Sequence, residues 1–276
     1  MNVMNVRHAT DPDQIPGFDT DALRSRFLVE DLFGSAISMV YSHEDRIVVG
    51  GVRPSGAPVT LETADPLRAD HFLARRELGV VNVGTDPGTV TVDGTDHKLE
   101  AKEVLYVGRG SRDVSFAGEG GAAFYLVSTP AHATHPTRKG TLADATPIRL
   151  GEQRSSNERT IYKFIHADGI QSCQLVLGIT ELAAGSMWNT MPAHVHDRRT
   201  EVYLYFGLEP SDRVVHLMGR PDQTRNLIVA DRQAVISPPW SIHCGFGTGN
   251  YAFVWAMGGE NIDYADVEPY PIAELR

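Results

Sequence analysis

The chain has 276 residues, which is enough for one large domain or for two domains of about 140 residues each. Its apolar fraction of 42% is ordinary for a globular protein, and no apolar run approaches the ~20 residues of a membrane span. The net charge of −10 argues against a nucleic acid or a membrane surface as partner, because phosphate binding depends on clustered Lys and Arg. A small anionic substrate stays compatible with this charge, since it needs only one or two local cations.

The N-terminus and the cysteine content indicate the cellular compartment. The first residues, MNVMNVRHATDPDQ, lack the uninterrupted apolar segment that a signal peptide needs. Cys173 and Cys244 are too few for a disulfide framework, and we expect both to be free thiols. These features predict a cytoplasmic protein.

The predicted elements begin with one helix and continue as strands. Residues 19–33 are expected to form a helix capped by Asp19 or Thr20, with apolar side chains on one face at Leu23, Phe27 and Leu32. From residue 35 the pattern changes to short runs such as SAISMVY and IVVGGV, separated by polar turns. With many glycines and prolines between such runs, the sequence predicts a mainly β protein with a few short helices.

An internal repeat divides the chain. The first half contains RRELGVVNV at residues 75–83 and EVLYVGRGSRDVSF at 103–116. The second half contains RRTEVYLYF at 198–206 and AVISPPWSIHCGF at 234–246. In both halves an Arg-Arg pair opens a strand, and a second apolar strand then runs into a Gly or Pro turn. We expect two copies of one β unit.

The segment between the two copies, residues 130–159, is rich in Pro, Thr, Ser and charged residues. It predicts a boundary that separates residues 1–140 from residues 141–276. His132 and His135 lie in this segment at a spacing found in metal sites, but no periodicity brings them together. We expect them in a solvated loop.

The strongest chemical signal is MPAHVHDRRTEVYLYF, residues 191–206. Alternate residues of a strand point to the same side, so His194 and His196 would present both imidazoles to one face. After a tight turn, Glu201 would face them from the next strand. His243, which follows a Pro-Pro turn in the second strand of the repeat, is the candidate for the fourth ligand. Such a set of N and O donors suits a divalent transition metal.

The first copy of the repeat serves as an internal comparison. Nothing before Arg75 and Arg76 resembles the His-x-His pattern, and Arg112 stands about where His243 falls in the second copy. We therefore expect a first half without metal and a second half that carries the site.

The four candidate ligands resemble the metal motifs of the cupin superfamily of small β-barrels. The first cupin motif has the form G-x5-HxH-x3,4-E-x6-G, and the second has the form G-x5-PxG-xx-H-x3-N. Gly185, His194, His196, Glu201 and Gly207 are similar to the first motif, and Pro238 and His243 to the second. This resemblance implies two cupin jelly-roll β-barrels, a bicupin.

A more specific resemblance covers nearly the whole chain. Stretches such as HFLARRELGVVNVG, RTIYKFIHADGIQSCQLVLGIT and SPPWSIHCGFGTGNYAFVWAMGGEN look like the 5-keto-4-deoxyuronate isomerases, or 4-deoxy-L-threo-5-hexosulose-uronate ketol-isomerases, of pectin breakdown. The resemblance implies isomerisation of that anionic sugar to 3-deoxy-D-glycero-2,5-hexodiulosonate. It also implies one Zn²⁺ per subunit, a cytoplasmic location and a homo-oligomer, commonly a hexamer. The implied zinc ligands are His194, His196, Glu201 and His243.

The implied reaction needs a cation for the substrate carboxylate and a carrier for protons. The cation candidates are Arg198, Arg199, Arg154 and Lys163, because a guanidinium or ammonium group pairs with a carboxylate. Gln171 and Gln174 are further candidates beside the site. Proton transfer and a hydride shift both stay open, with proton transfer the favoured route, and the possible proton carriers are Tyr203, Tyr205 and His166.

Two other classes of function fit the same four ligands. A cupin with three His and one Glu could hold Fe(II) or Mn(II) and act as a dioxygenase, because ligand type alone rarely fixes the metal. A sugar-binding protein with a structural metal is the third class. Oxygen uptake and the activity of metal-stripped protein would discriminate among the three.

Overall fold

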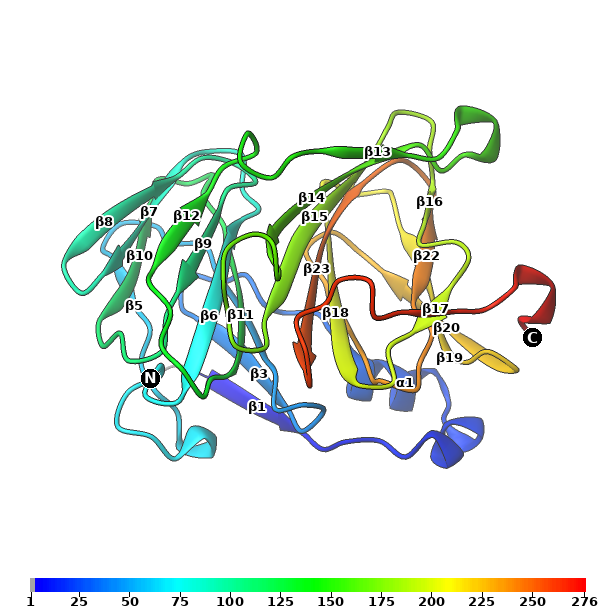
Figure 1. Ribbon diagram of the computed structural model, residues 1–276, viewed down its shortest axis with the longest axis horizontal. Coiled ribbons are helices and arrows are strands. Elements are labelled where there is room, and N and C mark those ends of the chain that lie inside the picture. The colour runs from blue at the N-terminus through cyan, green and yellow to red at the C-terminus, as the bar shows by residue number, and fades with distance from the viewer. Residues whose placement is uncertain (1–2) are drawn as a thin grey trace.

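The computed structural model describes residues 3–276 as two β-sandwiches side by side, each with a seven-stranded and a four-stranded sheet (Figure 1). In the first sandwich the large sheet has the strand order β1 (Val3–Arg7), β3 (Ser38–Ser42), β4 (Val48–Val52), β11 (Phe124–Pro130), β6 (Arg76–Asn82), β9 (Val104–Val107) and β12 (Arg138–Gly140). The small sheet has the order β5 (Val59–Thr60), β10 (Val114–Gly118), β7 (Gly88–Val92) and β8 (Thr95–Leu99). The first half is thus mainly β, as predicted.

The second sandwich repeats this plan. Its large sheet has the order β13 (Ile148–Leu150), β14 (Arg159–Ile165), β15 (Val176–Leu182), β23 (Ala252–Gly259), β18 (Arg199–Phe206), β21 (Ala234–Ser237) and β2 (Leu28–Val29). Its small sheet has the order β16 (Trp188–Asn189), β22 (Cys244–Gly247), β19 (Val214–Arg220) and β20 (Gln223–Val229). A separate pair joins β17 (His194–Val195) to β24 (Glu268–Pro269). The predicted division at residues 140 and 141 falls between β12 and β13, and the independence of the two parts stays a prediction.

The internal repeat is present in the strand pairing. Strand β6 lies between β11 and β9, and β18 lies between β23 and β21, all antiparallel. Arg76 pairs with the last residue of β11 and Arg199 with the last residue of β23, so the two Arg-Arg pairs open equivalent strands. Two positions further along, Leu78 in the first half therefore stands where Glu201 stands in the second. The candidate metal ligand Glu201 of the second half thus corresponds to an apolar residue, Leu78, in the first half.

The two sandwiches pack through their large sheets. A continuous apolar core contains buried side chains of both halves, including Val81 and Tyr125 from the first and Leu177 and Val254 from the second. Gly79 shows how closely the sheets approach, because a Cβ atom there would lie 2.9 Å from the Leu177 side chain. Two further apolar cores fill the interiors of the sandwiches. The interface between the two halves is thus itself a hydrophobic core.

Helices are few and short. The only α-helix in residues 3–276 is α1 (Thr20–Phe27), accompanied by the 3-10 turns η1 (Pro12–Gly17), η2 (Asp65–Leu67), η3 (Gln153–Ser155) and η4 (Ile272–Glu274). Within these described residues, no helix is long and apolar enough to cross a membrane. Asp19 caps α1 by accepting a hydrogen bond from the Ala22 amide, as expected for an N-cap carboxylate.

Helix α1 is shorter than the predicted helix over residues 19–33. It ends at Phe27 because the chain becomes extended at Leu28, where β2 pairs with β21 of the second half. Leu23 and Phe27 pack into the core of the second sandwich, although they come from the start of the chain. A long-range strand pairing therefore overrides the local helical pattern, as tertiary contacts often do.

A buried carboxylate links the two halves. Glu77, on β6, is fully buried and accepts hydrogen bonds of 2.8–3.0 Å from the Tyr106 and Thr129 hydroxyls and from the backbone amides of residues 173–175. The amides belong to the loop that leads into β15 of the second half. Hydrogen bonds to an ionised acceptor are stronger than those between neutral groups, so Glu77 fixes this loop against the first sandwich.

Replacing Glu77 by Gln is expected to lower the free energy of unfolding by about 3 kcal/mol, because the amide NH2 group would face buried donors and leave them unsatisfied. Chemical denaturation measures this change. The matched control is Glu181→Gln, which breaks a half-exposed ion pair with Lys102 across the same junction and should cost less than about 1 kcal/mol. Equal losses in the two variants would contradict the role of Glu77.

Candidate metal centre

His194 and His196 reach the same point because the chain is extended between them. His194 lies on β17, and Val195 turns the opposite way into a small apolar cluster with Ala193, Ile242 and Cys244. The Arg199 amide then donates to the His196 carbonyl and closes the turn that leads into β18. The alternation expected from the sequence thus places both imidazoles on one side.

Glu201 lies on a strand of the large sheet, and His243 lies in the loop between β21 of that sheet and β22 of the small sheet. Glu201 is the third residue of β18 and pairs with Ser237 at the end of β21, after which the chain turns back to His243 just before β22. His243 Nε2 lies 2.6 Å from Glu201 Oε2, and His196 Nε2 lies 2.9 Å from the same oxygen. Both contacts are buried.

The third histidine completes the group. His194 Nε2 lies 3.0 Å from His196 Nε2 and 3.1 Å from His243 Nε2. Donor atoms that share one ion at about 2.0–2.2 Å lie roughly 3 Å from each other. Among residues 3–276 this is the one group of three or more His, Cys, Asp or Glu side chains that could hold a metal ion.

The hydrogen bonds behind the imidazoles fix which nitrogen carries the proton. His196 Nδ1 donates to the Asp266 carbonyl at 2.9 Å, and His243 Nδ1 donates to the Ser241 carbonyl at 3.3 Å. Their Nε2 atoms are therefore left with lone pairs that point toward Glu201 Oε2, which also carries only lone pairs. Such an arrangement is repulsive unless a cation lies between the donors, so the residues fit a metal ion.

The protonation states also suit a metal. Burial, together with the neighbouring His243 and His196, lowers the pKa of His194 to about 2. Burial opposes ionisation of Glu201, but the neighbouring His243 and His196 outweigh it and hold the pKa of this carboxyl below its usual range. A neutral imidazole and an ionised carboxylate are the forms in which these side chains bind metals.

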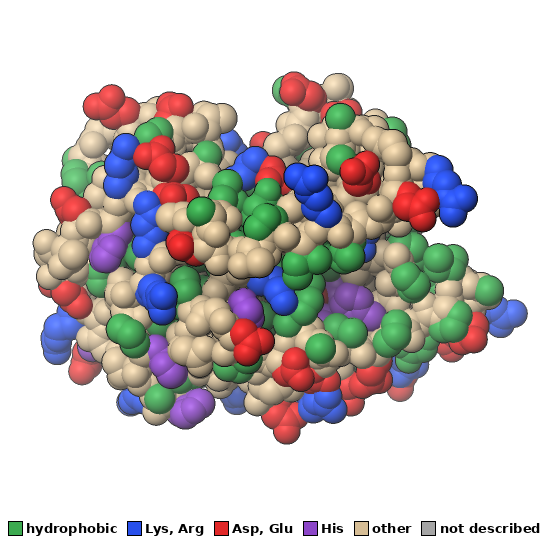
Figure 2. Space-filling view, turned by 45° about the horizontal axis from the view of Figure 1, so that its top comes forward, with side chains coloured by type: hydrophobic (Ala, Val, Ile, Leu, Met, Phe, Trp, Pro, Cys, Tyr) green, Lys and Arg blue, Asp and Glu red, His purple; other side chains and the backbone are tan. Residues whose placement is uncertain are grey.

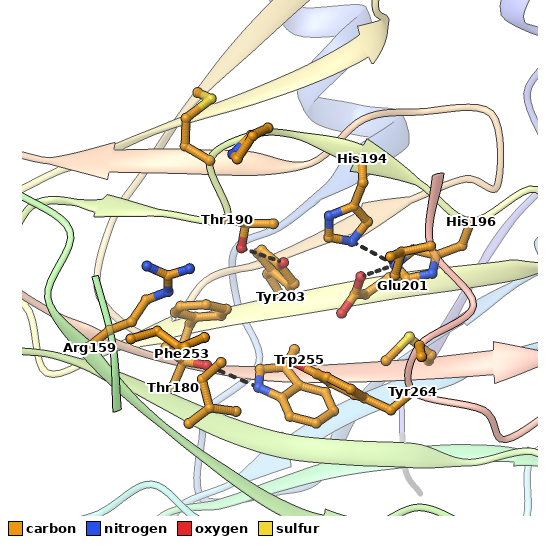
Figure 3. Close-up of a pocket in the computed structure, with 17 residues that line it drawn as sticks. Arg159, Thr180, Thr190, His194, His196, Glu201, Tyr203, Phe253, Trp255 and Tyr264 are labelled. Carbon is orange, nitrogen blue, oxygen red and sulfur yellow. Dashed lines mark hydrogen bonds and ion pairs between the residues drawn. The ribbon is translucent and has the colours of Figure 1, made fainter. Parts of the chain in front are cut away.

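The metal group forms one wall of a cavity of about 370 Å³ in the second sandwich (Figure 3). Apolar side chains from β14, β23 and the loop after β16 make most of the lining, namely Ile161, Met191, Pro192, Phe253, Trp255 and Met257. Figure 2 shows histidine in a hollow rimmed by hydrophobic side chains. Small-molecule sites typically combine such apolar walls with a few convergent polar groups.

The segment after β23 closes the cavity and supports the ligands. Tyr264, Ala265 and Val267 line the cavity, and the Asp266 carbonyl between them accepts from both His196 and Arg199. The Asp266 carboxylate forms an ion pair with Arg198. The adjacent arginines thus both contact Asp266, and neither lines the cavity.

Comparison with known proteins identifies the family. Residues 29–270 match the model of the KduI/IolB family. The chain belongs to the KduI/IolB family. A relative from Kineococcus radiotolerans is 54% identical over 280 residues, 99% of this chain and all of the relative. A relative from Bacillus subtilis is 50% identical over 276 residues, with the same coverage. Both are named 4-deoxy-L-threo-5-hexosulose-uronate ketol-isomerase, and this KduI/IolB member is likewise a ketol-isomerase.

Solved structures agree on the fold of this family. An IolB-like protein from Salmonella typhimurium LT2 matches with a TM-score of 0.66 at 15% identity, covering 81% of this chain and 86% of that one. An oxalate decarboxylase from Bacillus subtilis matches with a TM-score of 0.56 at 11% identity, covering 79% and 70%. The architecture is the bicupin predicted from the sequence.

The three candidate proton carriers lie in different places in this KduI/IolB chain. Tyr203 lines the cavity, and its hydroxyl lies 3.0 Å from the Thr190 hydroxyl. Tyr205, two residues further along β18, is buried beneath it and is hydrogen-bonded to His216 at 2.8 Å. His166 lines a second cavity, formed by the segment between the two sandwiches and the loop after β14. Of the three, the structure brings only Tyr203 to the metal group.

The other sequence candidates lie away from the cavity. Lys163 lines the second cavity and stacks its ammonium group over the Tyr264 ring at 4.9 Å. Arg154 is exposed and paired with Glu152, and Gln171 is exposed in the loop after β14. Gln174 contributes its backbone amide to the Glu77 junction. His132 is exposed, as expected for a solvated loop.

The hydroxyl residues Thr180, Thr190 and Tyr264 line the cavity and were not among the candidates. The cation Arg159 was also missed. It opens β14 two residues before Ile161, which also lines the cavity, so the period of two places both on one face. A strand-end arginine two residues before an inward-facing apolar residue was therefore the available signal.

Proposed function

We propose that this ketol-isomerase converts 5-keto-4-deoxyuronate, the aldose, into the ketose 3-deoxy-D-glycero-2,5-hexodiulosonate in the breakdown of pectin and other uronates. Full-length relatives at 50–54% identity that carry this name support the proposal. The main structural support is a group of three histidines and one glutamate beside a cavity of small-molecule size.

We further propose that the cofactor is one Zn²⁺ per chain, held by His194, His196, Glu201 and His243. Such a set of imidazole and carboxylate donors, with room in the cavity for substrate oxygens, suits a catalytic zinc ion. Bound zinc would act as a Lewis acid and lower the free energy of charge developing on the substrate oxygens by several kcal/mol. The carbonyl of Asp266 positions His196 for this task.

The remaining side chains of the cavity bind and orient the sugar. The Tyr203 and Thr190 hydroxyls form a hydrogen-bonded pair beside the metal group, where they can donate to or accept from the oxygens of the reacting carbons. Burial raises the pKa of Tyr203 well above its ordinary value, so this phenol stays protonated. The apolar walls exclude water from the reacting carbons.

The location and assembly belong to the same proposal. We propose a cytoplasmic enzyme that works as a homo-oligomer, a hexamer, on a small anionic sugar and not on a nucleic acid or a membrane. Sedimentation at several protein concentrations measures the assembly, and a monomer throughout the range would contradict this part.

The proposed reaction is tested by incubating the zinc-loaded protein with the 4-deoxy-5-keto uronate released from unsaturated digalacturonate. NMR spectra are expected to show loss of the aldehyde carbon and growth of a hydroxymethyl group next to a new ketone. Consumption of dissolved oxygen would point instead to a dioxygenase. Binding of the sugar without any product would point to a non-catalytic sugar-binding protein.

A further inference from the structure

The cavity has two chemically different ends (Figure 3). His194, His196 and Glu201 lie together at one end, and the Arg159 guanidinium lies at the other, with Tyr203 and Thr190 between them. The metal group comes from β17 and β18, whereas Arg159 comes from β14 near the edge of the same large sheet. One cavity thus has metal-binding side chains at one end and a cationic side chain at the other.

The charge of Arg159 is not compensated by the protein. One nitrogen of its guanidinium donates to the Asn157 carbonyl at 2.9 Å, but no carboxylate in residues 3–276 lies within ion-pair distance of it. Burial lowers the pKa of Arg159 from its ordinary value. A partly buried guanidinium with free donors is the group that binds a carboxylate through two parallel hydrogen bonds.

Other charged groups do not offer an alternative anchor in this cavity. Among its lining residues Arg159 is the one cation, and Glu201 is the one acid. Arg198 and Arg199 are bonded to Asp266 and do not line the cavity, and Lys163 stands over the Tyr264 ring and lines the second cavity. An anionic ligand in this cavity therefore meets a single fixed positive side chain.

We infer that Arg159 forms a carboxylate-binding subsite that holds the acid end of the substrate and so directs its aldehyde end to the metal group. The inference rests on the proposed function. The reacting carbons C1 and C2 lie at the opposite end of the six-carbon chain from the carboxylate. In the same way, the metal group and the Arg159 guanidinium lie at opposite ends of the cavity. The Tyr203 and Thr190 hydroxyls then face the middle of the chain.

This subsite determines specificity between acidic and neutral sugars. A neutral sugar would bury the Arg159 guanidinium without a partner, and a site built to pair with a substrate group discriminates strongly against analogues that lack it. The reaction itself takes place at the other end of the cavity. Arg159 is accordingly expected to act mainly on substrate binding and orientation and to leave metal binding unchanged.

The test compares Arg159→Gln and Arg159→Lys with the wild type on two substrates, the uronate and its neutral analogue with a hydroxymethyl group in place of the carboxylate. For the uronate, Arg159→Gln is expected to lower kcat/KM by about 10²–10³-fold, mostly through KM, and Arg159→Lys by less. For the neutral analogue, Arg159→Gln should have a kcat/KM at least as high as that of the wild type, because no guanidinium is then buried without a partner. Metal content and circular dichroism should match the wild type in both variants.

Arg154→Gln is the matched control, because Arg154 is an exposed arginine five residues earlier whose loss should leave both substrates unaffected. A kcat/KM of Arg159→Gln within twofold of the wild type on the uronate would overturn the inference alone. Equal losses on the acidic and neutral sugars would do the same. A wild-type enzyme that is inactive on the uronate would overturn the proposed function and this inference with it.

Discussion

Purified protein is expected to contain about one divalent ion per chain, and Glu201→Gln and His243→Ala should each lose it along with the isomerase activity. Glu201 supplies the one anionic donor of the group, and its oxygen contacts two of the three imidazoles. The amide of Gln is neutral, and its NH2 group would meet the lone pairs of the imidazoles. Removing His243 instead opens one side of the group. Elemental analysis of gel-filtered protein measures both losses.

A double variant, His132→Ala with His135→Ala, serves as the control. These two histidines are spaced along the sequence like the ligands of some metal sites, but they lie in the loop between β11 and β12, away from the metal group. Their replacement should therefore leave metal content and activity unchanged. Full metal occupancy in both Glu201→Gln and His243→Ala would refute the assignment of the ligands. Circular dichroism checks that each variant is folded.

When the reaction is run in heavy water, we expect almost no deuterium on the carbon that gains hydrogen. Within the described chain, no carboxylate or imidazole outside the metal group lines the cavity, and its other polar groups are the hydroxyls of Thr180, Thr190, Tyr203 and Tyr264 and the guanidinium of Arg159. None of these is a suitable base for a carbon-bound proton near neutral pH. The hydrogen on C2 should therefore pass directly to C1 with its electron pair.

In this transfer C2 is oxidised to the ketone and C1 is reduced to the alcohol, so no outside oxidant or reductant is needed. The proton on the C2 oxygen must move to the C1 oxygen, and the paired hydroxyls of Tyr203 and Thr190 can relay it. Mass spectrometry and NMR of the product measure the carbon-bound label after turnover is confirmed.

Close to one deuterium per product would contradict direct transfer and would indicate a proton carrier at the site. Tyr203→Phe would then be compared with Tyr205→Phe, because the two hydroxyls lie on the same face of β18 but only Tyr203 reaches the cavity. A carrier is expected to lose kcat by about 10²-fold or more while keeping its metal.

The metal group could be foreseen from the sequence because its geometry is mostly local. The period of two along a strand aligns His194 with His196, and a short turn brings Glu201 opposite them. The prediction of His243 as the fourth ligand also needed the internal repeat, in which a second strand returns beside the first. Two copies of a mainly β unit followed from the same repeat and from the short apolar runs between turns, and the bicupin architecture followed from the resemblance to the cupins.

The far end of the cavity could not be foreseen in the same way. Arg159 and Lys163 share one face of β14, but the register shifts between Lys163 and Ile165, and the two side chains reach different cavities. The segment that supports His196 through Asp266 lies 70 residues further along the chain and carries no periodic pattern. Which side chain enters a cavity therefore depends on packing between distant segments, which strand alternation does not encode.

The pairing of β2 with β21 also bears on how the chain acquires its structure during synthesis. Leu28 and Val29 leave the ribosome long before their partners Val235 and Ala234. At about 5–20 residues per second, the first strand waits on the order of ten to forty seconds for its neighbour. During that interval the apolar side chains of Leu23, Phe27 and Leu28 have no core to enter. The second barrel consequently closes only when an early and a late part of the chain meet.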